Sequence, residues 1–96
     1  MRIIKLMPDY QCHPLWEASP GAMGNIDPDT LPISRDLVAH LAEWAKTYDS
    51  TLNVDDPVQS GFKSDGERLD FIGAGNRLAE ALQAELGVDY LVKVKI

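Results

Sequence analysis

Residues 34–48 place the strongest constraint on the fold, because they form an amphipathic pattern with a clearly marked beginning. The hydroxyl of Ser34 can accept a hydrogen bond from a free backbone N–H of the first helical turn, and Asp36 suits the positive end of the helix dipole. The apolar residues that recur at helical spacing are Leu37, Val38, Leu41, Trp44, Ala45 and Tyr48. The pattern predicts a helix with one buried face, on which Trp44 and Tyr48 are interpreted as core residues before interface anchors.

A second helix is predicted to begin at Ser64 and to end before Gly87. Ser64 and Glu67 have the spacing of a capping box, in which each side chain accepts a hydrogen bond from the other residue's backbone N–H. The buried stripe is expected to contain Leu69, Ile72, Ala79, Leu82 and Leu86, widened by Phe71 and Leu78. Gly73 and Gly75 weaken a helix by about 1 kcal/mol each relative to alanine, which indicates either close approach of the first helix or a local break.

Extended segments are predicted at both ends of the chain. Residues 2–7 are apolar at both alternating positions, which predicts a central strand buried on both faces. Residues 88–96 predict a strand whose dry face contains Val88, Tyr90, Val92, Val94 and Ile96. Residues 10–16 fit either an irregular extended segment or a short second strand, whereas the glycines and prolines of residues 18–32 predict a loop that cannot sustain a helix.

These elements predict an α+β fold in the form of a two-layer sandwich. The expected sheet is small, with two or three strands including both termini, and is covered by a two-helix hairpin. At 96 residues the chain has the length of a single domain.

The charge of the chain is acidic and unevenly distributed. Fifteen Asp and Glu residues against nine Lys and Arg residues give a net charge of −6. This balance argues against nucleic acid or an anionic membrane as the main partner, since binding to either begins with neutralisation of phosphates. Because Arg2, Lys5, Lys93 and Lys95 lie near the ends, residues 9–91 hold all fifteen acids, only five bases and a balance of −10. A basic protein would complement the charge of this acidic central region.

Cys12 is the single cysteine, which excludes an internal disulfide and suits a reducing cytosol. The sequence shows neither a signal peptide nor an apolar run of membrane-spanning length. A cytoplasmic location is therefore expected.

Three patterns that resemble chemical sites are interpreted as structural. Cys12 and His13 are adjacent, so they cannot easily close on one ion or one substrate. The glycines of residues 73–75 follow a helical run instead of a strand, and residues 49–60 lack the glycine and the final Glu of a calcium loop. We predict no catalytic residue, no cofactor and no metal site, and a protein that is not an enzyme. A small hydrolase or transferase using Cys12, His13 or His40 remains the alternative.

The acidic residues around the helix ends allow two interpretations. They can form a solvated surface that maintains solubility. They can equally form a negative patch that captures a basic protein, with steering by charge and anchoring by an aromatic residue such as Trp16 or Phe62.

Segments from most of the chain resemble a group of small acidic bacterial proteins. The segments read YQCHPLWE, GNIDPDTLPISRDL, EWAKTYDSTLN, DDPVQSGF and GNRLAEALQAELG. In size, charge and lack of a recognisable site, the chain is also similar to the immunity proteins of contact-dependent growth-inhibition and related polymorphic toxin systems.

This resemblance implies a cytosolic inhibitor that blocks the active site of a cognate toxin domain, often a nuclease with a basic cleft. Acidic side chains would occupy the places of substrate phosphates, and association would be fast and salt-sensitive. The residues expected to contact the toxin are Glu43, Asp49, Asp55, Asp56 and Asp70 for charge, with Trp16 and Phe62 as anchors. The alternative is a non-enzymatic adaptor or regulatory module that binds a protein through apolar and aromatic surface.

Overall fold

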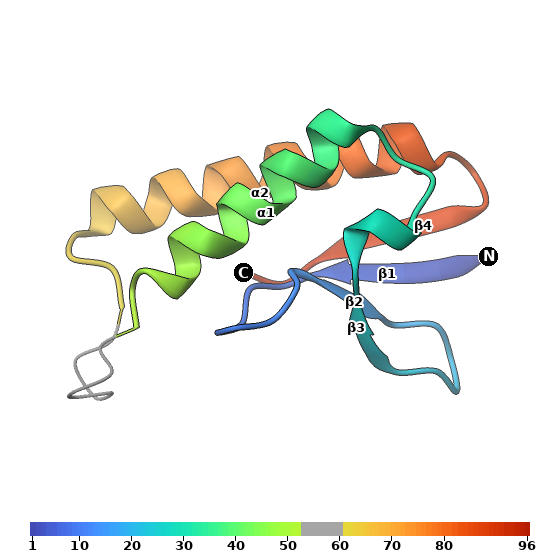
Figure 1. Cartoon of the computed structure of the whole chain (residues 1–96), viewed down its shortest axis with the longest axis horizontal. Helices are drawn as coiled ribbons and strands as arrows, with labels where there is room; N and C mark the ends of the chain where they lie inside the picture. The colour runs from blue at the N-terminus through green and yellow to red at the C-terminus, as the bar shows by residue number, and fades with distance from the viewer. Residues whose placement is uncertain (53–60) are drawn as a thin grey trace.

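The computed structural model describes residues 1–52 and 61–96. Two antiparallel helices lie side by side on one face of a small sheet (Figure 1). The elements in chain order are β1 (Arg2–Leu6), β2 (Leu15–Glu17), β3 (Gly24–Ile26), the 3₁₀ helix η1 (Pro28–Thr30), α1 (Arg35–Asp49), α2 (Asp65–Leu86) and β4 (Tyr90–Val94). The predicted α+β class is confirmed, but the sheet has four strands within the described residues instead of two or three.

The strands are ordered β3-β2-β1-β4 in a mixed sheet. β1 pairs antiparallel with β2, which pairs antiparallel with β3, whereas β1 pairs parallel with β4. A parallel pair needs a long crossover, and here the two helices lie in that connection. The predicted central position of β1 is therefore confirmed, and β4 occupies one edge of the sheet.

β3 lies in the segment that was predicted to be only a loop, and that prediction was wrong. The strand has just three residues, Gly24–Ile26, too few to show an alternating pattern. The Asn25 side chain holds it in place: Oδ1 accepts a hydrogen bond from His13 N at 2.8 Å, while Nδ2 donates to His13 O at 2.7 Å and to Leu15 O at 2.9 Å. The same segment contains one turn of 3₁₀ helix, capped by the Asp27 side chain.

The core lies between the helices and one face of the sheet. Its fully buried side chains are Ile4, Leu6, Leu15, Leu41 and Leu82. On β1, the alternate residues Ile3 and Lys5 are only partly buried, because neither α1 nor α2 covers their face of the sheet. The expectation that this strand is buried on both faces was therefore wrong.

Both helices begin at the predicted serines. Ser34 Oγ accepts a hydrogen bond from Leu37 N at 3.1 Å, and Ser64 Oγ accepts one from Glu67 N at 3.1 Å. The second half of the predicted capping box differs, since the Glu67 carboxylate accepts from Lys63 N at 3.2 Å instead of from Ser64 N.

The helices approach each other closely at Gly75. A Cβ built on this residue would lie only 2.6 Å from Cζ2 of Trp44. Trp44 is buried, stacks on Phe71 with ring centroids 4.4 Å apart, and donates its Nε1–H to Phe71 O at 3.0 Å. The core role of Trp44 and the close approach at Gly75 are confirmed. At Gly73 a Cβ would meet only Arg77 Nη1, at an ordinary 3.5 Å.

Two predicted apolar faces are covered less completely than expected. On α2 the stripe consists of Phe71, Gly75, Ala79, Leu82 and Leu86. Leu69 lies outside this stripe and is 59% exposed. Val88 precedes β4 and is 90% exposed, whereas Tyr90 and Val92 are partly buried. The predicted dry face is therefore covered only where α2 packs on the edge strand.

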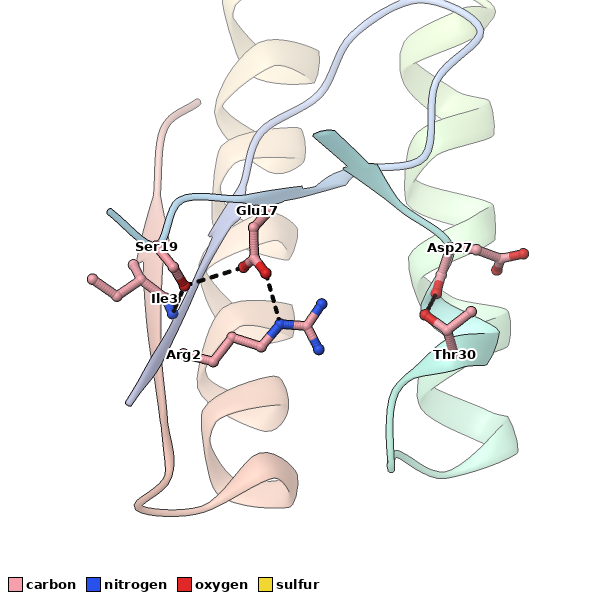
Figure 2. A network of polar contacts seen from close by, with 6 residues as sticks. All are labelled: Arg2, Ile3, Glu17, Ser19, Asp27 and Thr30. Atoms are coloured by element: carbon pink, nitrogen blue, oxygen red, sulfur yellow. Dashed lines mark hydrogen bonds and ion pairs between the residues drawn. The ribbon is translucent and has the colours of Figure 1, made fainter. Parts of the chain in front are cut away.

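A polar network joins the start of β1 to the end of β2 (Figure 2). Arg2 Nε forms an ion pair with Glu17 Oε1 at 3.0 Å. Ser19 Oγ donates to Glu17 Oε2 at 3.3 Å and accepts a hydrogen bond from Ile3 N at 2.9 Å. Glu17, the only acidic residue in a described strand, is thereby neutralised within the fold.

Candidate functional site

A shallow groove runs between α1 and α2 and consists of two adjoining hollows. Both hollows are lined by Trp44, Thr47 and Ala74, which makes them continuous. Stacked Trp44 and Phe71 form an aromatic floor at one end of this groove, which we call the helix groove. Trp44 and Phe71 are each only 5% exposed, so they form the buried base of the groove, and residues of both helices form its walls.

Acidic side chains from both helices stand along the helix groove. Glu43 comes from α1, and Glu67 and Asp70 come from the first turns of α2; all three are exposed. Basic side chains also line it, namely Lys63 at the end and Arg77 farther along α2. The groove thus combines an aromatic floor with carboxylates contributed by two different elements.

Three of the predicted partner-binding residues lie along this groove. Asp70 and half-buried Phe62 line the hollow near the start of α2, and Glu43 lines the adjoining hollow. Phe62 belongs to a cluster with Tyr48 and Phe71, at centroid distances of 6.4 and 5.0 Å. The Phe62 ring therefore packs against Tyr48 and Phe71 and also lines the helix groove.

The Tyr48 hydroxyl titrates in a partly covered environment. Its ring also stacks on Tyr10, with centroids 4.6 Å apart. Burial raises the pKa of Tyr48 above its ordinary value of 10.0, and neighbouring Tyr10 and Asp9 add to the rise. Tyr48 is therefore a neutral packing residue at physiological pH.

The other predicted residues are not part of the helix groove. Asp49 Oδ1 accepts a hydrogen bond from Gln11 N at 2.8 Å, and Gln11 has the left-handed φ of 59°. The Asp49 carboxylate therefore stabilises the left-handed backbone conformation at Gln11. Asp55 and Asp56 lie outside the described residues.

Trp16 lies on the face of the sheet that is turned away from α1 and α2. Its register partners are Lys5 on β1 and Asn25 on β3, while adjacent Leu15 is buried on the helix side. The indole Nε1–H donates to Met7 O at 3.0 Å. Trp16 is therefore separated from the acidic residues with which it was grouped.

The described residues contain no group of three or more His, Cys, Asp and Glu side chains suited to hold a metal ion. Cys12 and His13 line a different hollow, beside Asp27, Asp29 and Asp49. The Asp27 side chain accepts a hydrogen bond from Asp29 N at 3.0 Å and thereby caps the 3₁₀ helix.

Neither α1 nor α2 combines the length and the apolar character needed to cross a bilayer.

Comparison with protein-family models matches residues 2–95 to the family described as Serratia CdiI immunity protein-like. The chain belongs to this family. The resemblance to immunity proteins of contact-dependent growth-inhibition systems is thereby confirmed. None of the curated proteins compared with this member of the family matches it.

Sequence reasoning missed two polar side chains that hold the two edge strands of the sheet in this member of the family. Asn25 fixes β3, and Gln83 on α2 binds the backbone of β4. Asn25 lies 12 residues from its partner His13, and Gln83 lies 9 residues from its partner Val92. No local pattern marks such a residue, because its role depends on how the elements pack.

Proposed function

We propose that this chain neutralises a cognate toxin domain by binding it in the cytosol, without catalysing a reaction itself. The proposed partner is a basic domain, a nuclease with a cationic cleft. Membership of an immunity-protein family supports a protein partner, and the balance of −10 over residues 9–91 supports a basic one.

The single observation that carries this proposal is the pairing of charge with apolar surface in the helix groove. Glu43 and Asp70 project from two rigid helices beside the Trp44–Phe71 floor. Carboxylates in this arrangement can take the positions of substrate phosphates on a basic cleft, while half-buried Phe62 and Ala74 supply apolar contact area. Asp55 and Asp56 belong to the proposed surface on the grounds of their sequence position and charge.

Charge reversal in the helix groove tests the proposal. The double variant Glu43→Lys with Asp70→Lys should bind the co-expressed cognate toxin domain at least tenfold more weakly, since close charge pairs across interfaces contribute roughly 1.5–7 kcal/mol. Protection of cells that produce the toxin should fall with affinity. Glu80→Lys is the matched control, because Glu80 lies on α2 but lines a different groove.

The control variant should bind and protect as the native chain does. Calorimetric titration at low and high salt provides the affinity, and the native complex should weaken as salt rises. Native-like binding by the double variant would remove the helix groove from the interface. Loss of protection in Cys12→Ala with binding intact would instead favour the enzymatic alternative.

An adaptor that binds through apolar surface is the second candidate. The partly covered sheet face with Ile3 and Trp16, together with 39% exposed Leu91, favours it. Such a complex would be nearly insensitive to salt, which distinguishes it from capture by acidic side chains.

A further inference from the structure

The outer edge of β4 presents a row of backbone groups that the sheet leaves for another partner. Arg2 N donates to Asp89 O at 3.0 Å and Lys95 N donates to Leu6 O at 2.9 Å, so the odd-numbered residues of this strand bond inward to β1. In a parallel ladder the alternate residues direct their N–H and C=O groups away from the neighbour. Tyr90, Val92 and Val94 therefore face the free edge.

Gln83 occupies the first half of this edge. Its Oε1 accepts from Val92 N at 2.8 Å, and its Nε2 donates to Tyr90 O at 2.8 Å. These are the bonds that a further strand would make at the same positions. Beyond Gln83, no hydrogen bond within residues 1–52 and 61–96 occupies Val94 N, so the second half of the edge remains available.

A groove follows this edge between β4 and α2. Its apolar lining includes Ala79, Ala84, Val92 and Val94, and Glu80 stands beside them. Val94 is 42% exposed although it belongs to a strand. A strand added here would direct every second side chain into this groove, where small apolar groups fit and the Glu80 carboxylate disfavours acidic ones.

The other face of the same strand is basic. Lys93 and Lys95 alternate along it, and Lys5 on β1 lies in register with Lys93. Glu17 pairs in register with Ile4 on the helix side, and Asp89, at an odd-numbered position before β4, lies at the opposite end of the strand from Lys93 and Lys95. Carboxylates on an added strand would therefore meet lysines directly across the pair.

We propose that the free edge of β4 from Val92 to Ile96 binds an extended segment of a partner protein in which apolar and acidic side chains alternate. The backbone of the segment would bond to Val94, its acidic side chains would pair with Lys93 and Lys95, and its apolar side chains would enter the groove beside α2. This edge shares no lining residue with the helix groove, so the inference is independent of the proposed toxin interface.

A second copy of the chain is a poorer occupant. Antiparallel pairing of two β4 strands about a twofold axis would place Lys93 or Lys95 of one copy opposite a lysine of the other. Like charges directly across a strand pair are destabilising. Gln83 also shortens the edge available for such pairing.

The test uses the full chain and a short, capped peptide of alternating valine and glutamate, with the matching valine–lysine peptide as control. We expect the glutamate peptide to bind and to slow hydrogen exchange at the Val94 amide, and the lysine peptide to do neither. The double variant Lys93→Glu with Lys95→Glu should lose roughly tenfold in affinity for the glutamate peptide and prefer the lysine peptide.

Two further variants locate the binding on the backbone edge. Val94→Pro removes the outward N–H without deleting a bond to β1, and it should abolish binding. Gln83→Ala frees Tyr90 O and Val92 N, so it should lengthen the edge and tighten binding if the thermal transition shows a folded chain. Equal binding of both peptides, binding that survives Val94→Pro, or a β4-mediated dimer in sedimentation would overturn the proposal.

Discussion

Glu85, in the last turn of α2, receives two hydrogen bonds from Ser34, the residue that caps the start of α1. Ser34 Oγ donates to Glu85 Oε2 at 2.9 Å, and Ser34 N donates to Glu85 Oε1. The carboxylate thus lies at the positive end of the first helix dipole, where a negative charge is favourable. One contact joins the end of the second helix to the beginning of the first.

Removal of this contact should weaken the helical layer. We expect Ser34→Ala to lower the free energy of unfolding by about 1–2 kcal/mol, since it loses the cap on Leu37 N and the bond to Glu85. Glu85→Ala should cost about 1 kcal/mol or less because the pair is exposed. Urea unfolding of both single variants and of the double variant measures the coupling free energy between Ser34 and Glu85. If the two single losses simply add in the double variant, the contact contributes nothing to stability.

Gly75 and Gly73 form an internal comparison of two glycines in one helix. Gly75→Ala should destabilise the chain by about 1–3 kcal/mol, because its Cβ would overlap the Ile96 side chain and the Trp44 ring. Gly73→Ala should stabilise it by up to about 1 kcal/mol, since alanine favours helix and the site has room. Thermal and urea unfolding check the opposite signs, and equal effects would show that helix propensity alone governs both sites.

The raised pKa of Tyr48 predicts a loss of stability in alkaline solution. When the folded chain holds the proton more tightly than the unfolded chain, the stabilisation is complete below the unfolded pKa of about 10 and falls as pH rises through the higher folded value. Urea unfolding at increasing pH should therefore show decreasing stability above pH 10.0. Tyr48→Phe should reduce that decrease, while an unchanged slope would assign it to other groups.

The Asn25 amide predicts a local effect at the β3 edge. Asn25→Asp replaces two N–H donations, to His13 O and Leu15 O, by a carboxylate that repels both carbonyls. We expect a cost of about 1–3 kcal/mol and faster hydrogen exchange along β2 and β3. Met23→Ala, at a neighbouring residue that is 91% exposed, is the control and should leave exchange unchanged.

The features predicted correctly depend on groups close together in the sequence. Ser34 and Ser64 each bond to the N–H three residues later, so the signal for each helix start is local. Trp44 follows a helical period, which placed it in the core. Gly75 carried the signal of close helix packing, although Gly73 carried the same signal and makes no such contact.

Glu43, Asp70 and Phe62 remain predicted partner-binding residues, and the structure places all three along the helix groove. Charge and aromatic character are visible in sequence, but the face on which a side chain lies depends on sheet register. Trp16 pairs across the sheet with Lys5, on the side away from the helices. Asp49 is instead engaged by the Gln11 backbone, 38 residues earlier in the chain.

The sequence by itself determined the two helices, the central strand, the acidic balance and the family, because periodicity, capping and composition are local or summed properties. Only the tertiary structure decided that β4 runs parallel to β1, that three residues around Asn25 form a strand, and that carboxylates of two helices border one aromatic groove. These outcomes depend on hydrogen bonds and packing between residues that are distant along the chain. Such contacts stabilise the fold only after the helices and the sheet have come together.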